Sequence, residues 1–355
     1  MGDPHLQRRG IRLGTPAPIG GSARHALHMK ERCSMHTKQR STKRGWFRGT
    51  GLLALAVLAG SALIAACGGD DEVEQATGLD DRGYHNTDRL VTTQWIEDNL
   101  DNDDVILFDV RNEEQYAAGH IPGAIRLAAN QVFQKEIDGV AGLIPPADEV
   151  AASLAAVGAT PDHTLVFYDQ RGSIWASRAI WVLAVYGHAD ARLLDGDFPL
   201  WESQGREVST DVPSPTAAEY AFSGDPDNDI IAGWEEVVAE IDNVESLVCD
   251  ARSAEEYAGR DVRAERGGHI PNAVNVDWAR ALNEDGTFLP ADQLRELYEG
   301  EGVVGGKTIY TLCQTAVRAT HTWFVLVDLL GYESVKVYDG SWTEWGNRTD
   351  TPIES

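Results

Sequence analysis

A cysteine stands where an apolar strand gives way to a helix-length segment. Cys313 follows the apolar run at residues 307–312, and the segment after it has a continuous apolar face that stops at Gly331. The residues that lead into this segment are Gln314, Thr315, Ala316, Val317 and Arg318. Amides at a helix N-terminus, the helix dipole and the Arg318 guanidinium all favour a thiolate over a thiol. The pattern therefore predicts that Cys313 is a nucleophile, in surroundings that would also stabilise an anionic persulfide, Cys–S–S⁻.

The alternative for Cys313 is a buried, unreactive cysteine at a strand end. Arg318 argues against it, because a buried loop with no anion to bind gives no reason for an arginine. Cys249 shows the opposite pattern, since it lies inside an apolar strand and corresponds to Phe108 in an earlier copy of that strand. We expect Cys249 to pack in the core, with a redox role beside Cys313 as the alternative.

The motifs around Cys313 occur twice in the chain. An apolar strand ending in Asp-x-Arg appears at residues 105–111 and again at 246–252. Each copy is followed by Gly-His-Ile-Pro-x-Ala, at residues 119–124 and 268–273. A repeat unit of this length is too long for a solenoid, so it indicates two copies of one domain.

Cys313 has a counterpart in the first copy, and that counterpart is Asp169. From these two residues onward the copies align without a gap, as the matching positions of Gly187 and Gly331 show. Further along, an Asp-Gly pair and then a tryptophan recur at equal spacing in both copies. The thiol is therefore present in only one of two otherwise matching loops.

Short apolar strands alternate with helix-length segments in each copy, which predicts an α/β fold with a parallel sheet and helices on both faces. Ligands of such sheets bind beyond the carboxyl ends of the strands, where Asp169 and Cys313 fall. We expect a first domain at residues 86–208, a linker rich in proline and serine at 209–224, and a second domain at 225–355.

The N-terminus has the pattern of an export signal, predicted to span residues 1–66. A basic stretch at 38–48 precedes an apolar run at 51–66, which is too short for a comfortable membrane span. The run ends in Leu-Ile-Ala-Ala before Cys67, which resembles the bacterial lipobox. We therefore expect a lipid on Cys67, a tether at residues 67–85, and attachment to the outer side of a bacterial membrane.

Residues 1–34 resemble neither a signal nor a fold, so translation is expected to begin at Met29 or Met35. An ordinary cleaved signal and an uncleaved anchor are the alternatives to the lipoprotein. The sequence around Lys43 and Arg44 resembles a twin-arginine signal with lysine in the first position.

Charge excludes one class of partner. The chain has 30 Lys and Arg against 56 Asp and Glu. Residues 1–66 hold 11 of the basic and 2 of the acidic residues, which leaves the remainder a balance of −35. Such a surface repels nucleic acid. It is typical of a soluble protein or of a protein that functions in high salt. Four cysteines without paired spacing also argue against a zinc site or a disulfide scaffold.

Both copies resemble rhodanese domains, and the resemblance covers residues 86–355. It implies two tandem rhodanese-like domains, of which the first has lost its cysteine and the second is catalytic. It also implies transfer of sulfane sulfur from a small anionic donor such as thiosulfate to cyanide or a thiol. The transfer would proceed through a persulfide on Cys313 and use no metal or organic cofactor. The amides of Gln314, Thr315, Ala316 and Val317 would hold the sulfur, and Arg318 would bind the donor.

Departures from the family bear on the donor. Thr315 takes the place of a lysine or serine of the thiosulfate and 3-mercaptopyruvate enzymes, and Glu256 replaces a substrate-binding arginine. Arginines of an insertion, Arg260, Arg263 and Arg266, are candidates to supply the missing charge. Asp250 and Arg252 are expected to form a supporting ion pair. Thiosulfate is the preferred donor and 3-mercaptopyruvate the alternative.

Several histidines and tryptophans are expected to have structural roles and not catalytic ones. His120 and His269 are expected to fix their turns, and His321 is a weak site candidate. Trp175 and Trp278 are expected in the core, with a lining role in a cleft between the domains as the alternative.

Two other functions remain open from the sequence. Some phosphatases resemble this fold but place five residues between cysteine and arginine, whereas four separate Cys313 from Arg318. The shorter loop makes a tighter pocket that suits sulfur better than phosphate. A non-catalytic sulfur-binding or sensor protein is the other alternative, and Glu256 is its best support. We expect a monomer.

Overall fold

The structure is a computed structural model that describes residues 78–355. The predicted signal region, the lipid site at Cys67 and most of the tether lie outside the described residues. No helix among residues 78–355 is both long and apolar enough to cross a membrane. Both halves of the repeat belong to one compact unit.

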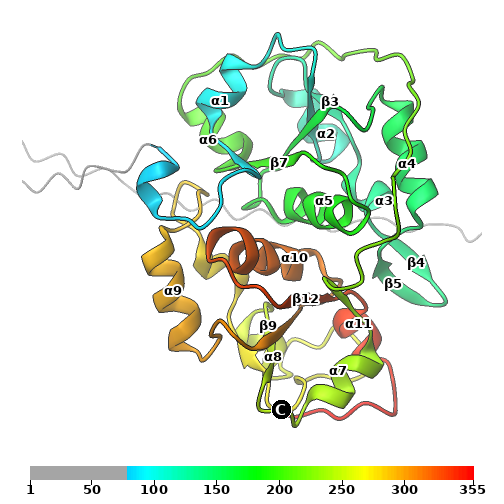
Figure 1. The fold of residues 1–355 in the computed structure, drawn as a ribbon, viewed down its shortest axis with the longest axis vertical. Helices are drawn as coiled ribbons and strands as arrows, with labels where there is room; N and C mark the ends of the chain where they lie inside the picture. The colour runs from blue at the N-terminus through cyan, green and yellow to red at the C-terminus, as the bar shows by residue number, and fades with distance from the viewer. Residues whose placement is uncertain (1–77) are drawn as a thin grey trace, which may run out of the picture. The chain divides into compact units, whose positions relative to one another are not determined.

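Each half is built on a five-stranded parallel sheet with the same topology (Figure 1). The first sheet runs in the order β1 (Leu90–Val91), β7 (Ala191–Leu194), β6 (Thr164–Tyr168), β2 (Val105–Asp109), β3 (Ile125–Arg126). The second runs in the order β10 (Val274–Asn275), β9 (Ser246–Asp250), β11 (Thr308–Leu312), β12 (Val335–Tyr338), β8 (Ile231–Ala232). The repeat predicted from the sequence is therefore a repeat of structure.

Helices cover both faces of each sheet. In the first half they are α1 (Thr93–Asp98), α2 (Glu113–Ala118), α3 (Ala129–Val132), α4 (Ala147–Ala156), α5 (Ile174–Val185) and α6 (Asp197–Ser203). In the second they are α7 (Trp234–Glu240), α8 (Ala254–Tyr257), α9 (Ala291–Gly300), α10 (Val317–Phe324) and α11 (Ser341–Trp345), with a 3₁₀ helix η2 at Trp278–Ala281. A short 3₁₀ helix, η1 (Asp80–Arg82), precedes the first sheet.

Alternating strand residues supply two separate cores. In β6, Leu165 and Phe167 face one cluster, whereas Val166 and Tyr168 face the other. This is the period of two that a strand with helices on both faces requires. The cluster with Leu165 continues into the second half through α5 and α10, which pack side by side (Figure 1). The predicted α/β fold with helices on both faces is confirmed.

Helix starts in the two halves use the same local device. Asn112 and Gln115 form a capping box at the start of α2, and Ser253 and Glu256 form one at the start of α8. In such a box the first side chain binds the third helical amide, and the third side chain binds the cap amide. Both helices thus begin directly after an Asp-x-Arg strand end.

The gapless alignment of the halves is wrong at one place. The last left-handed residue before the helix is Ser173 in the first half, four positions after Asp169, and Ala316 in the second half, three positions after Cys313. In the second half a π-helical turn, η3 (Val325–Leu329), accommodates one extra residue, so the two halves are in the same alignment again after it. The loop of the cysteine is therefore one residue shorter than its counterpart.

Candidate active site

Cys313 lies directly after β11, and its side chain is buried at 1% exposure. The Ser341 hydroxyl accepts hydrogen bonds from the amides of Cys313 (3.2 Å) and Ala316 (3.1 Å), and donates to the Tyr338 carbonyl. Ala316 and Ser341 both adopt positive φ, at 61° and 48°. The loop is thus folded tightly around one hydroxyl, at a backbone cost that is typical of functional sites.

The corresponding loop of the first half holds an anion. The Asp169 carboxylate accepts hydrogen bonds from the amides of Arg171 (2.5 Å), Trp175 (2.8 Å) and Ala176 (3.4 Å). Because α10 starts one residue earlier than α5, the amides of Arg318 and Ala319 correspond to those of Trp175 and Ala176. A loop of this construction therefore binds negative charge at the position that the Cys313 side chain occupies in the second half.

Arg318 is held by a buried carboxylate. Its guanidinium makes two hydrogen bonds to Glu256, at 2.7 and 2.8 Å, and Glu256 is only 2% exposed. Burial alone would raise the pKa of Glu256, but the hydrogen bonds and charge of Arg318 outweigh burial and lower it to about 2. Burial opposes the positive charge of Arg318, yet Glu256 and the neighbouring Cys313 sulfur together raise the pKa of Arg318. Arg318 thus lies beside the sulfur, with its charge already paired.

The insertion arginines take three different places. Arg263 lies 3.3 Å from Glu256 and is also paired with Asp261, and its carbonyl accepts a hydrogen bond from the Gln314 side chain. Arg266 instead donates to Trp345 and Thr351 of the C-terminal segment, so it is a structural residue.

The remaining insertion arginine, Arg260, pairs with Glu255 in solvent. Of the three arginines, therefore, only Arg263 approaches the Cys313 loop.

A hairpin from the first half covers the Cys313 loop. Strands β4 (Lys135–Ile137) and β5 (Val140–Leu143) form it, and it lies at the edge of the first half near α11 (Figure 1). Gly142 has φ +92°, and a Cβ on it would lie 2.8 Å from the Thr315 Cβ. The Thr343 hydroxyl lies within hydrogen-bond distance of the Gln314 carbonyl (2.8 Å) and of the Ala141 carbonyl of the hairpin (3.1 Å). A hairpin of the first half thus packs against the Cys313 loop of the second.

Asp339 connects the halves beneath this hairpin. It accepts hydrogen bonds from Arg178, whose side chain is fully buried, and from the Ile144 amide. Its counterpart Asp195 likewise accepts a hydrogen bond from Phe288 of the opposite half. The Asp-Gly pairs repeat in the sequence, but the sequence pattern predicts no role for them, because a contact between two copies leaves no local signal.

Asp250 and Arg252 form a buried ion pair at the end of β9, with an N···O distance of 2.6 Å. Arg252 also donates to the Gly268 carbonyl and stacks over Trp342. Asp109 and Arg111 repeat this pair in the half that lacks the cysteine. The pair fastens the Gly-His-Ile-Pro turn to the sheet.

The other singled-out residues are buried or partly buried away from the Cys313 loop. Cys249 is fully buried in β9, where burial and Asp250 raise the pKa of its thiol. His321 is fully buried between Phe288 and Trp278, and burial lowers its pKa to about 3. His120 and His269 stack on tyrosines of their own turns.

Ser341 is the site residue that the sequence did not reveal. It directly follows Asp339-Gly340, and this position is Asp197 in the first half. Asp197 plays the same part there, because it accepts the amides of Asp169 and Ser173. An alignment of the two halves at this position was the available signal.

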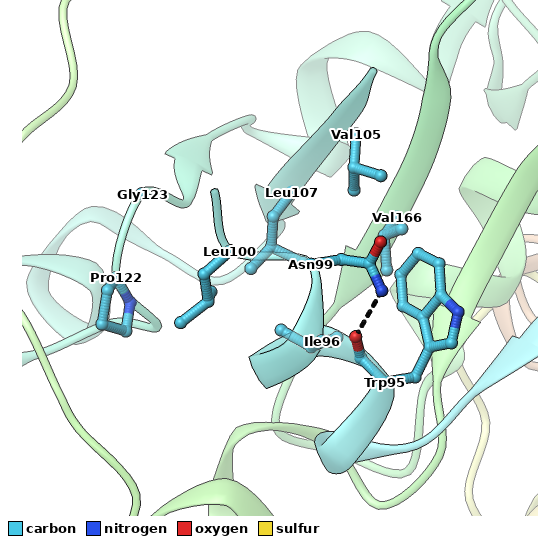
Figure 2. A pocket seen from close by; sticks show the side chains of 9 residues that line it. All are labelled: Trp95, Ile96, Asn99, Leu100, Val105, Leu107, Pro122, Gly123 and Val166. Carbon is cyan, nitrogen blue, oxygen red and sulfur yellow. Dashed lines mark hydrogen bonds between the residues drawn. The ribbon is translucent and has the colours of Figure 1, made fainter. Parts of the chain in front are cut away.

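A small surface cavity of about 40 Å³ lies elsewhere, between α1 and the first sheet (Figure 2). Its lining is mainly apolar, and the Asn99 amide donates to the Trp95 carbonyl within it. It holds no titratable or nucleophilic side chain. Among residues 78–355 no group of three His, Cys, Asp or Glu is placed to hold a metal ion.

A family model of the rhodanese-like domain matches the chain twice, at residues 92–204 and 234–348. The chain is 40% identical over 275 residues to a Saccharopolyspora erythraea protein named "Putative thiosulfate sulfurtransferase", covering 75% of this chain and 96% of that one. It is 38% identical over 283 residues to the sulfur carrier protein TtuD of Thermus thermophilus, covering 76% and 98%.

Among solved structures, the anaerobic ergothioneine biosynthesis enzyme of Chlorobium limicola matches with a TM-score of 0.70 at 23% identity. That match covers 77% of this chain and 71% of the enzyme, and it shows the fold.

The fold and the sequence relatives together define a class, that of tandem rhodanese-type sulfurtransferases. The chain belongs to the rhodanese-like family, as its motifs predict.

Proposed function

We propose that the protein moves sulfane sulfur from thiosulfate or a related donor to cyanide or a thiol, through a persulfide on Cys313. One observation carries this proposal. The loop at the end of β6 binds a carboxylate with backbone amides, and the equivalent loop at the end of β11 carries a cysteine. A persulfide is an anion, so a loop built to hold negative charge stabilises it.

The chemistry needs two steps. The Cys313 thiolate attacks the outer sulfur of thiosulfate, a Cys–S–S⁻ bond forms, and sulfite leaves with the electron pair of the broken S–S bond. An acceptor thiolate or cyanide then attacks the outer sulfur of the persulfide and regenerates the Cys313 thiolate. Neither step requires a metal or an external oxidant.

Two alternative functions differ in which donor transfers sulfur to Cys313 and in whether that sulfur is passed on. A 3-mercaptopyruvate sulfurtransferase would load Cys313 from that donor and not from thiosulfate. A non-catalytic sulfur-binding or sensor protein would form the persulfide on Cys313 but would not pass its sulfur to an acceptor. The 38% identical relative that is named a sulfur carrier makes a thiol acceptor on a protein a suitable second acceptor to test.

The test is the intact mass of the purified protein before and after addition of thiosulfate. A gain of one sulfur, about 32 Da, that cyanide reverses would support the persulfide on the nucleophile. Cys313→Ala should abolish the gain, and Cys249→Ala, which removes the other free thiol of the described residues, should retain it. No gain with thiosulfate or 3-mercaptopyruvate would refute sulfur transfer.

We further propose that the protein is exported and anchored through a lipid on Cys67, with residues 1–66 as its signal. The support is the sequence pattern alone, an apolar run that ends in small residues before the cysteine. Metabolic labelling with a fatty-acid analogue tests it. Label that persists after Cys67→Ala would contradict the lipoprotein.

A further inference from the structure

We propose that Glu256 determines donor specificity at Cys313. By neutralising Arg318 it would make the site favour sulfane donors with one negative charge or none over the thiosulfate dianion. This inference rests on the proposed sulfur transfer. The donor class that the geometry favours is an organic thiosulfonate, R–SO₂–S⁻, or a low-molecular-weight persulfide.

The pairing of Glu256 with Arg318 is close and shielded from water. The two terminal nitrogens of the Arg318 guanidinium each donate to one carboxylate oxygen of Glu256. Glu256 is 2% exposed, and the side chain of Arg318 is 17% exposed. Charge-assisted pairs of this geometry are strong, and a donor would have to displace the carboxylate to obtain the same two bonds.

The next charges around the pair also cancel. Arg263 approaches Glu256 at 3.3 Å, but Asp261 binds Arg263 at 2.5 Å. The cluster of Arg318, Arg263, Glu256 and Asp261 therefore has no net charge. Beyond the cluster, residues 67–355 carry a balance of −35. A dianion thus meets no excess positive charge close to Cys313 and repulsion further away.

The carboxylate of Glu256 is not needed for its structural role. Glu256 is the third residue of α8 and completes the capping box with Ser253. At the equivalent position in the first half, Gln115 completes the same box with Asn112. A glutamine therefore satisfies the helix start in this fold, and the charge of Glu256 must act on something else. Arg318 is its partner.

Both donors react by the same balanced step, and they differ in the group R that replaces one thiosulfate oxygen and in the charge that this oxygen carries. With thiosulfate, Cys–S⁻ takes the outer sulfur to give Cys–S–S⁻, and SO₃²⁻ leaves. With a thiosulfonate, the same bond forms, and the sulfinate RSO₂⁻ leaves. In each case the S–S bond of the donor breaks, and its electron pair departs with the leaving group.

The experiment compares kcat/KM for thiosulfate and for methanethiosulfonate, with cyanide as acceptor, in the full-length protein. Glu256→Gln removes the charge and keeps the capping group that the first half already uses. We expect the ratio of thiosulfate to thiosulfonate kcat/KM to rise about five- to tenfold, the effect of one unit charge at this range in a partly solvated site.

Glu255→Gln is the matched control. It removes one charge from the same helix, but at an exposed side chain paired with Arg260 in solvent. In Glu255→Gln the ratio of thiosulfate to thiosulfonate kcat/KM should stay within about twofold of the wild-type value, because water and salt screen surface charge. Glu256→Asp keeps the charge and should keep the wild-type preference as well.

The outcomes separate the two proposals. Wild-type protein that forms no persulfide with either donor refutes sulfur transfer itself. Persulfide formation with an unchanged donor ratio in Glu256→Gln, or an equal change in Glu255→Gln, refutes only the role of Glu256. A fall in the ratio would show that Glu256 positions Arg318 for the dianion, which is the opposite of this inference.

Discussion

The carboxylate of Asp169 occupies, in the first half, the position that the thiol of Cys313 occupies in the second. Asp169 follows β6 as Cys313 follows β11, and each loop is closed by a side chain two residues after an aspartate, Asp197 or Ser341. In the first half the group that these amides bind is a side chain of the protein itself. In the second half, the proposed negative charge is that of the Cys313 thiolate or of the persulfide formed on it.

Replacing Asp169 should therefore destabilise the fold without removing the proposed chemistry. Asp169→Ala leaves three amides without their acceptor, and we expect a loss of about 2–3 kcal/mol in the free energy of unfolding. Urea denaturation measures this loss. Asp162→Ala, an exposed residue of the same half, should change stability by less than about 0.5 kcal/mol. Equal effects of the two variants would contradict the anion-binding role of the loop.

Ser341→Ala should weaken both the fold and the nucleophile. It deprives the amides of Cys313 and Ala316 of their shared acceptor, for an expected loss of about 1–3 kcal/mol. A loop that is no longer fixed by this hydroxyl should also form the persulfide about tenfold more slowly. Rapid-quench mass spectrometry can follow this rate. Ser334→Ala, at an exposed serine before β12, serves as the control for both readouts. Persulfide formation at the wild-type rate in Ser341→Ala would show that the loop does not need this hydroxyl.

Arg178→Met should open the Cys313 loop from the other half. Arg178 binds Asp339, Phe133 and Gly142 while fully buried, so its loss leaves a buried carboxylate without its charge partner. We expect a loss of about 3–5 kcal/mol and faster alkylation of Cys313 by iodoacetamide, because the hairpin that covers it is released. Arg192→Met breaks a partly exposed ion pair with Asp190 and should cost less than about 1 kcal/mol. Unchanged alkylation in Arg178→Met would mean that the hairpin does not control access.

His321 predicts a dependence of stability on pH. Burial lowers its pKa to about 3 in the folded protein, below the ordinary value of 6.5, so folding favours the neutral ring. Its contribution is fully present above pH 6.5 and is lost as the pH falls from there towards 3. Between pH 7.5 and pH 5 the loss from this residue should be about 2 kcal/mol.

His321→Phe tests this dependence, because the ring packs against Phe288 and Trp278, and neither ring nitrogen has a partner among residues 78–355. The variant should match the wild type at pH 7.5 to within about 1 kcal/mol and lose less stability at pH 5. Urea denaturation at the two pH values checks it. An identical acid loss in both proteins would show that His321 does not carry the effect.

The family, the two-copy architecture and the presence of a cysteine at a strand-to-helix junction can be predicted from the sequence alone. These features are local or repeat along the chain: largely apolar strands of five residues such as β2, β6, β9 and β11, turn motifs, and a thiol followed by an arginine. Strand and helix patterns of this kind follow from neighbouring residues, so reading along the chain is sufficient.

The pairing of the charges near Cys313 is visible only in the folded chain. Glu256 was recognised as a departure, but its pairing with Arg318 joins residues 62 positions apart. The contact of Arg178 with Asp339 spans 161 positions and two domains. The one-residue difference between the loops was hidden because η3 restores the spacing before Gly331. Such relationships depend on how distant segments pack, and burial then sets whether two charges cancel or act. Sequence patterns single out Cys313 as the candidate nucleophile, whereas the packing of distant carboxylates and arginines around it determines its electrostatic surroundings.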